Sequence, residues 1–80
     1  MIGLNYIRNL YKKTTVDLAE ELGVTNGLIS QWEQGKKPIP AKRVEQLSKL
    51  FDIPEQYFTK QVSDIDKLLI ENIKIDQDIS

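Results

Sequence analysis

Apolar residues recur at spacings of three and four along most of this chain, and Gly and Pro residues interrupt the pattern. That spacing is typical of helices that bury one face. It marks four segments, at residues 4–11, 15–22, 26–34 and 40–51. Pro54 then opens a short fifth segment that contains Tyr57 and Phe58. The pattern therefore predicts an all-α fold of five helices, with a helical extension in residues 61–80.

The second and third segments are separated by a turn of only three residues, 23–25. Thr14 can cap the helix before this turn, and Asp17 three residues later gives a weak form of the capping box. Gly23 suits the left-handed backbone conformation just past a helix end. Ala19 is a small residue one turn earlier, so the two helices can cross closely. Together these features predict a helix-turn-helix unit.

Small and apolar residues in this unit occupy a fixed set of positions: Leu18-Ala19, Gly23-Val24, Ile29-Ser30, Trp32-Glu33 and Gly35. With these residues the chain resembles the phage-repressor and Cro type of helix-turn-helix, also called the XRE-like family. The resemblance covers residues 4–58, and it is specific because several positions agree at once. It implies a lambda-repressor-like five-helix bundle that binds duplex DNA. The alternative is a small helical bundle that binds no DNA.

The chain departs from the family pattern in two places. Lys12 and Lys13 stand where the family usually has Gly and then an apolar residue. The resemblance therefore leaves the turn after the first helix open, and we expect Tyr11 to cover the core edge there. Thr15 stands where the family often has a Gln that touches a DNA phosphate. We expect a weaker or water-mediated contact from this shorter side chain.

The resemblance also implies a structural ion pair between Arg8 and Glu33. Both residues lie beside apolar faces, where an unpaired charge is costly. We therefore expect the two side chains to lie within salt-bridge distance.

Residues 26–34 would form the recognition helix. The apolar spacing of this helix predicts that Leu28, Ile29 and Trp32 face inward. Trp32 is therefore expected to be a core residue and not a stacking platform for bases. The resemblance implies that outward residues near the start of this helix meet bases in the major groove. We expect base contacts from Asn26, Gly27 and Gln31, because Asn and Gln match the N6 and N7 edge of adenine. The alternative for these residues is plain solvated surface.

Phosphate contacts are expected on both sides of this helix. The resemblance places the loop at residues 35–40 and the start of the fourth helix along the DNA backbone, where basic residues cluster without a nearby acid. Backbone amides at a helix N-terminus also favour a phosphate. The residues that we expect to contact phosphates are Thr15, Thr25, Ser30, Lys36, Lys37, Lys42 and Arg43. The alternative is a solvated basic loop.

Composition narrows the classes of function. The chain has 80 residues, enough for one domain, and it contains no Cys and no His. Thiolate metal sites and the commonest general base are therefore excluded. We expect no enzyme, no catalytic residue, no metal and no cofactor. No apolar run approaches the ~18 residues of a membrane span, and the N-terminus does not resemble a signal peptide, so we expect a cytoplasmic protein without a membrane partner.

The formal net charge of −1 is unevenly distributed. Residues 1–60, the expected DNA-binding domain, hold nine basic and seven acidic residues, whereas residues 61–80 hold two basic and five acidic residues. A basic face matters more for nucleic-acid binding than the total charge.

The acidic C-terminal segment contains a heptad pattern. Its a and d positions hold Ile65, Leu68, Asn72, Ile75 and Ile79. An Asn at an a position favours a two-stranded parallel pair of helices, so this segment is a candidate dimerisation helix. The alternatives are a loosely ordered acidic tail and a sixth helix packed on its own domain, which Ile70 and Ile73 would favour because they lie off the heptad positions.

Taken together, these features predict a transcriptional regulator that binds duplex DNA sequence-specifically. We expect a repressor that binds a palindromic operator as a homodimer. One alternative is an antitoxin or protein-interaction module that uses the same domain, with a protein partner on the acidic tail. Another is the N-terminal part of a longer regulator.

Overall fold

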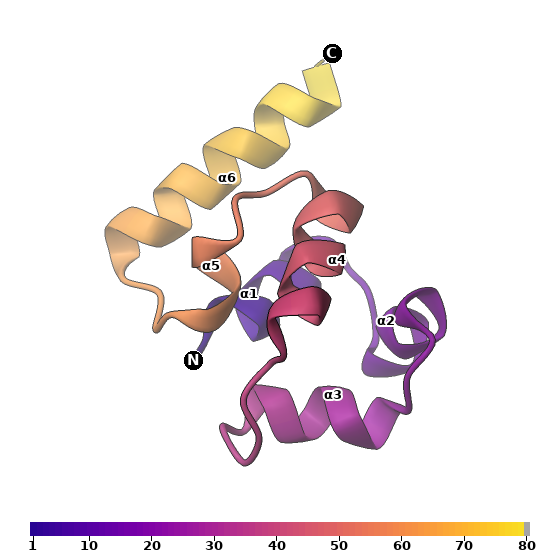
Figure 1. The fold of residues 1–80 in the computed structure, drawn as a ribbon. Coiled ribbons are helices and arrows are strands. Elements are labelled where there is room, and N and C mark those ends of the chain that lie inside the picture. The colour runs from indigo at the N-terminus through magenta and orange to yellow at the C-terminus, as the bar shows by residue number, and fades with distance from the viewer. Residues whose placement is uncertain (80) are drawn as a thin grey trace.

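Six helices make up the part of the chain that the computed structural model describes, residues 1–79 (Figure 1). They are α1 (Gly3–Leu10), α2 (Thr15–Leu22), α3 (Asn26–Glu33), α4 (Ala41–Phe51), α5 (Gln56–Thr59) and α6 (Asp64–Ile79). The prediction of an all-α, five-helix bundle with a C-terminal helical extension is confirmed. Several boundaries shift by one or two residues: α1 begins and ends one residue earlier than the segment 4–11, and α4 begins one residue after position 40. α3 ends one residue before position 34, and α5 begins two residues after Pro54.

All six helices contribute apolar side chains to one core. The fully buried ones include Leu4, Ile7, Leu18, Ile29, Leu47, Phe58 and Ile70. Trp32 is only 2% exposed and belongs to this core, as its helical spacing predicts. Within the core α2 packs against α3 and α4, while α5 packs against α1 and α4. The helix-turn-helix unit therefore lies on a support formed by α1, α4 and α5 (Figure 1).

The caps of α2 fix how the chain enters and leaves that helix. The Thr14 hydroxyl accepts a hydrogen bond from the Asp17 amide at 3.0 Å, and the Asp17 carboxylate accepts one from the Thr14 amide at 3.1 Å. This is the capping box that the sequence predicts. Gly23 ends the helix with φ at 73°, and the Val24 amide donates to the Ala19 carbonyl. The chain can therefore turn directly into α3.

The turn between α1 and α2 is closed by a strained residue. Lys12 has φ at 57°, a left-handed conformation that costs an L-residue roughly 1–2 kcal/mol. The turn thus keeps a conformation that suits Gly, although the chain has Lys there. The ring of Tyr11 packs edge-on against Phe51 at a centroid distance of 5.1 Å. Tyr11 covers this edge of the core, as expected.

The N-terminal residues hold the link between α5 and α6. Ile2 forms an antiparallel bridge with Gln61, and the Gly3 amide donates to the Lys60 carbonyl at 2.9 Å. A Cβ on Gly3 would lie 1.3 Å from the Tyr57 carbonyl oxygen. The Tyr57 backbone occupies the space that a side chain at position 3 would need, so only Gly fits this position.

α6 runs along one edge of the molecule and packs against the domain (Figure 1). Ile70 is fully buried, and Ile73 packs against the core. The Tyr6 hydroxyl donates to Glu71 at 2.9 Å, and the Gln77 amide group donates to the Phe51 carbonyl at 2.9 Å. The alternative of a loosely ordered tail therefore does not hold for residues 64–79. These residues form a sixth helix, α6, packed on its own domain, the alternative that Ile70 and Ile73 favour because they lie off the heptad positions.

Candidate nucleic-acid interface

α3 presents one buried and one polar face. Ile29 and Trp32 point into the core, whereas Asn26 and Gly27 are exposed and Gln31 is half-buried. Figure 1 shows α3 along the lower edge of the molecule, with the other helices on its upper side. The three residues expected to contact bases therefore lie on the accessible part of an otherwise buried helix.

The start of α3 is ordered by its own cap. The Thr25 hydroxyl accepts a hydrogen bond from the Leu28 amide at 3.2 Å. Thr25 itself is exposed, while Ser30 and Thr15 are half-buried. A structural role thus accounts for the Thr25 hydroxyl before any ligand is considered.

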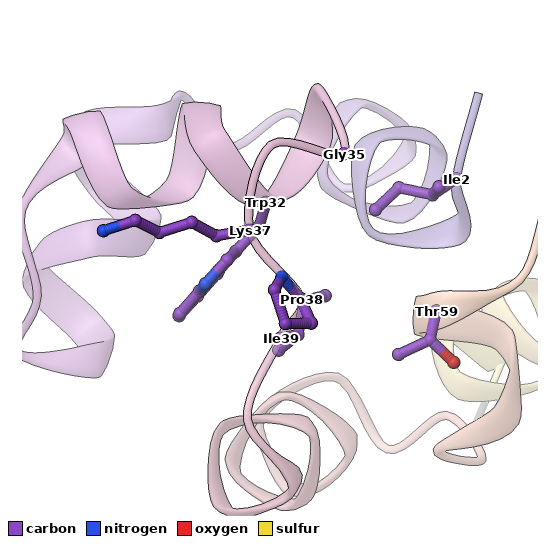
Figure 2. Close-up of a pocket in the computed structure, with 7 residues that line it drawn as sticks. All are labelled: Ile2, Trp32, Gly35, Lys37, Pro38, Ile39 and Thr59. Carbon is purple, nitrogen blue, oxygen red and sulfur yellow. The ribbon is translucent and has the colours of Figure 1, made fainter.

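The loop after α3 carries the basic residues predicted beside it. Gly35 adopts φ at 74°, and the amides of Lys36 and Lys37 both donate to the Gln31 carbonyl, at 2.9 and 3.3 Å. Lys36, Lys37 and Lys42 are all exposed. In Figure 2 the amino group of Lys37 is directed away from Ile2 and Thr59. Two exposed cations therefore follow the C-terminal end of α3, and a third lies in the first turn of α4.

Arg43 differs from these lysines. Its guanidinium donates through Nη1 to the Leu22 carbonyl at 3.0 Å and to the Gln46 side chain at 2.7 Å. Arg43 thus binds a carbonyl at the end of α2 and ties α4 to the helix-turn-helix unit. Sequence reasoning missed this contact, because nothing in the local pattern links residues 22 and 43.

An ion-pair network fixes α3 to α1. Arg8 Nε lies 2.6 Å from Glu33 Oε2 and Arg8 Nη2 lies 3.1 Å from Glu33 Oε1, so the pair that the resemblance implies is bidentate. Arg8 Nη1 also donates to the Lys13 carbonyl at 2.9 Å. The hydrogen bonds that Arg8 donates to the Glu33 carboxylate raise the pKa of the Arg8 guanidinium, although burial acts in the opposite direction. One side chain thus joins α1, the α1–α2 turn and the end of α3.

Two further contacts were not predicted. The Asn5 side chain donates to Glu33 Oε1 at 3.0 Å and completes the partners of that carboxylate. At the start of α6, the Asp66 carboxylate accepts from the Ser63 amide at 2.9 Å, and the Ser63 hydroxyl accepts from the Asp66 amide. The Ser63 amide and then Lys60 lower the pKa of Asp66. The Ser-x-x-Asp spacing is a capping pattern that could have located the start of α6.

A shallow cavity of about 350 Å³ lies beside the interface (Figure 2). Its lining is formed by Ile2, Trp32, Gly35, Lys37, Pro38, Ile39 and Thr59. Most of these residues are apolar, so the cavity separates the loop after α3 from the N-terminal residues without adding a polar site.

The described part of the chain, residues 1–79, holds no group of three acidic, His or Cys side chains that could bind a metal ion. It also holds no helix long and apolar enough to cross a membrane.

The arrangement of α2, the three-residue turn and α3 defines a helix-turn-helix protein. Residues 4–58 match the family model described as Helix-turn-helix, and the chain belongs to this family, in its Cro/C1 or XRE-like form. The family is one of DNA-binding regulatory domains and not of enzymes. Comparisons with curated proteins and with solved structures found no match.

Proposed function

We propose that this protein is a transcriptional repressor that binds duplex DNA sequence-specifically, with α3 in the major groove. One observation carries the proposal: the polar face of α3 lies beside three exposed lysines, Lys36, Lys37 and Lys42. The core and the ion pair between Arg8 and Glu33 hold α3 in place. A rigid, exposed recognition helix next to a basic loop is the electrostatic and geometric footprint of a DNA reader.

Base readout falls to the first turns of α3. Asn26 and Gln31 each carry a donor and an acceptor side by side, which suits adenine N6 and N7. Gly27 is exposed, and a Cβ added there would lie 4.0 Å from the Thr25 hydroxyl, so the backbone can approach a base or leave room for a thymine methyl. The preferred half-site therefore contains adenine opposite the start of α3.

Phosphate contacts fall to the residues around α3. Lys36, Lys37 and Lys42 neutralise phosphates and release counterions. Thr15 begins α2, Thr25 caps α3 and Ser30 lies within α3. Their hydroxyl groups add hydrogen bonds to the DNA backbone. Arg43 retains donors beyond Nη1 for the same role, but its main effect is to hold α4 in place.

Residues 1–60 form the DNA-binding unit in this proposal, and residues 61–80 form a dimerisation segment. A homodimer would read two half-sites one helical turn, ~34 Å, apart on a palindromic operator.

The test separates the two kinds of contact by titrating variants against a selected duplex and a random duplex over a range of salt. Asn26→Ala or Gln31→Ala should cost about 1–3 kcal/mol on the selected site and little on the random one. Lys36→Ala or Lys37→Ala should weaken binding to both duplexes equally, and should reduce the slope of the logarithm of affinity against the logarithm of salt concentration by about 0.9.

Lys49→Ala is the matched control, because Lys49 is an exposed cation in the last turn of α4. It should leave both affinities and the salt slope unchanged. Equal weakening of selected and random DNA by Asn26→Ala would show that Asn26 reads no base.

A further inference from the structure

α6 is amphipathic on two opposite faces. Its inner face carries Asp66, Ile70 and Ile73, which are buried or packed against the core. Its outer face carries large apolar residues that are between 45 and 79% exposed. We define the outer stripe as six exposed residues of this face: Ile65, Leu68, Leu69, Asn72, Ile75 and Ile79. Contiguous exposed apolar residues of this kind mark an interaction surface.

The outer stripe coincides with the heptad pattern. Ile65, Asn72 and Ile79 are its a positions, and Leu68 and Ile75 are its d positions. Ile70 is then an f position, which points directly away from a partner helix in a two-stranded pair. Ile70 is fully buried, so the domain packs on that f side of α6. A second helix can therefore approach the outer stripe without meeting the domain.

We propose that the outer stripe binds the α6 helix of a second copy of this chain, parallel and in register. The polar residue at its centre selects this occupant. In a parallel pair the two Asn72 side chains face each other and can hydrogen-bond, as a single Asn at an a position does. An antiparallel pair would set Asn72 against Leu68 or Ile75, and an unrelated apolar surface would also leave its amide unpaired at a cost.

Charges along the stripe limit the strength of the pair. Lys67 and Lys74 turn back toward the domain, where their amino groups lie 5.7 Å from the Tyr6 ring centre and 5.4 Å from the Tyr11 ring centre. The edge positions hold acids: Glu71, whose carboxylate accepts from the Tyr6 hydroxyl, lies beside Asp76 of the other copy in the parallel register. Like charges repel, so salt should strengthen this pair.

The size of the stripe leads to the same conclusion. Fifteen residues of helix extend about 22 Å, so each copy contributes on the order of a few hundred Å². A stable interface buries about 800 Å² per partner. The helix pair is therefore weak in solution and is completed when two copies occupy adjacent half-sites. This last step rests on the proposed function, whereas the pairing itself does not.

The first experiment is analytical ultracentrifugation of the full chain up to millimolar concentration, without DNA. The wild type should self-associate to a dimer, and raising the salt should tighten it. Leu68→Asp with Ile75→Asp should weaken self-association at least about tenfold. Circular dichroism and the unfolding midpoint should stay at the wild-type values, because both side chains are exposed in the monomer. Leu50→Asp, an exposed residue on α4, is the matched control and should dimerise like the wild type.

Cross-linking tests the register independently of those variants. The chain has no Cys, so Ile65→Cys introduces a single thiol at an a position. In the parallel pair the two thiols face each other within disulfide reach, and mild oxidation should give a covalent dimer. Leu50→Cys should give none under the same conditions.

A monomer at every concentration, or equal cross-linking of both Cys variants, would overturn the proposal. Dimerisation that weakens with salt would also contradict it. Each of these outcomes is separate from DNA binding. A chain that dimerises through α6 but binds no duplex would refute the proposed function and leave this inference standing.

Discussion

The ion pair between Arg8 and Glu33 gives the sharpest prediction about stability. The side chains are only 13% and 8% exposed, so removing one leaves the other charge largely out of water. Breaking a buried pair by removing one partner costs about 3–5 kcal/mol, and the residual exposure here favours the lower end. Arg8→Met keeps the aliphatic stem and should therefore cost about 3 kcal/mol. The free energy of unfolding of a domain of this size is about 4–12 kcal/mol in total, so this loss is a large fraction of the stability.

Removing both charges should be much less harmful. In Arg8→Met with Glu33→Leu no charge is left unpaired, and replacing a buried ion pair by apolar residues is often nearly neutral. The remaining cost is two lost hydrogen bonds, one from Arg8 Nη1 to the Lys13 carbonyl and one from the Asn5 side chain to Glu33, at about 1 kcal/mol each. The double variant should therefore be more stable than either single variant.

Urea unfolding followed by fluorescence measures these differences directly. The chain has one Trp, and Trp32 lies in the core close to Glu33, so its emission reports the loss of tertiary structure. Lys49→Ala serves as a control, because its ion pair with Glu45 is exposed and should contribute little. A near-neutral Arg8→Met, or a double variant whose cost equals the sum of the single costs, would refute the reasoning.

Three further predictions concern single positions. Lys12→Gly should stabilise the protein by about 0.5–1 kcal/mol in urea unfolding because it relieves the positive φ, whereas Lys12→Ala should give no such gain. Gly3→Ala should lower the unfolding midpoint by an amount that corresponds to about 2 kcal/mol or more, because its Cβ meets the Tyr57 carbonyl; an unchanged midpoint would show that this contact relaxes freely. Asp66 has a pKa in the folded state that lies below its pKa in the unfolded state. Its contribution to the stability of the fold is therefore present above about pH 4 and is lost as the pH falls through the folded-state pKa. Asp66→Asn should therefore be less stable than the wild type at pH 7 and equal to it in acid, as thermal unfolding across pH would measure.

Much of the fold could be predicted from the sequence because its signals are local. The capping box at Thr14, the left-handed Gly23 and the inward spacing of Ile29 and Trp32 each act within one or two helical turns. These features specified the helix-turn-helix unit before any long-range contact was known. The exposed position of Asn26 follows from the same spacing.

The contacts that escaped prediction join residues far apart in the chain. Arg43 reaches the Leu22 carbonyl, and Gln77 reaches the Phe51 carbonyl. No periodicity carries such information, because both depend on how whole helices cross. The same limit applies to α6, where the sequence presented pairing and packing on the domain as alternatives. The structure has α6 on its domain and leaves the heptad positions exposed, so the two arrangements are compatible.

Selection of binding sites from random duplex DNA tests the central proposal most directly. The full chain would be incubated with the pool, and the bound duplexes would be sequenced over several rounds, alongside Asn26→Ala with Gln31→Ala as the matched control. The wild type should enrich a palindromic motif with adenine in each half-site, with half-site centres one helical turn apart. The control variant should enrich a degraded motif or none. Recovery of duplexes without a shared motif by the wild type would contradict sequence-specific reading by α3.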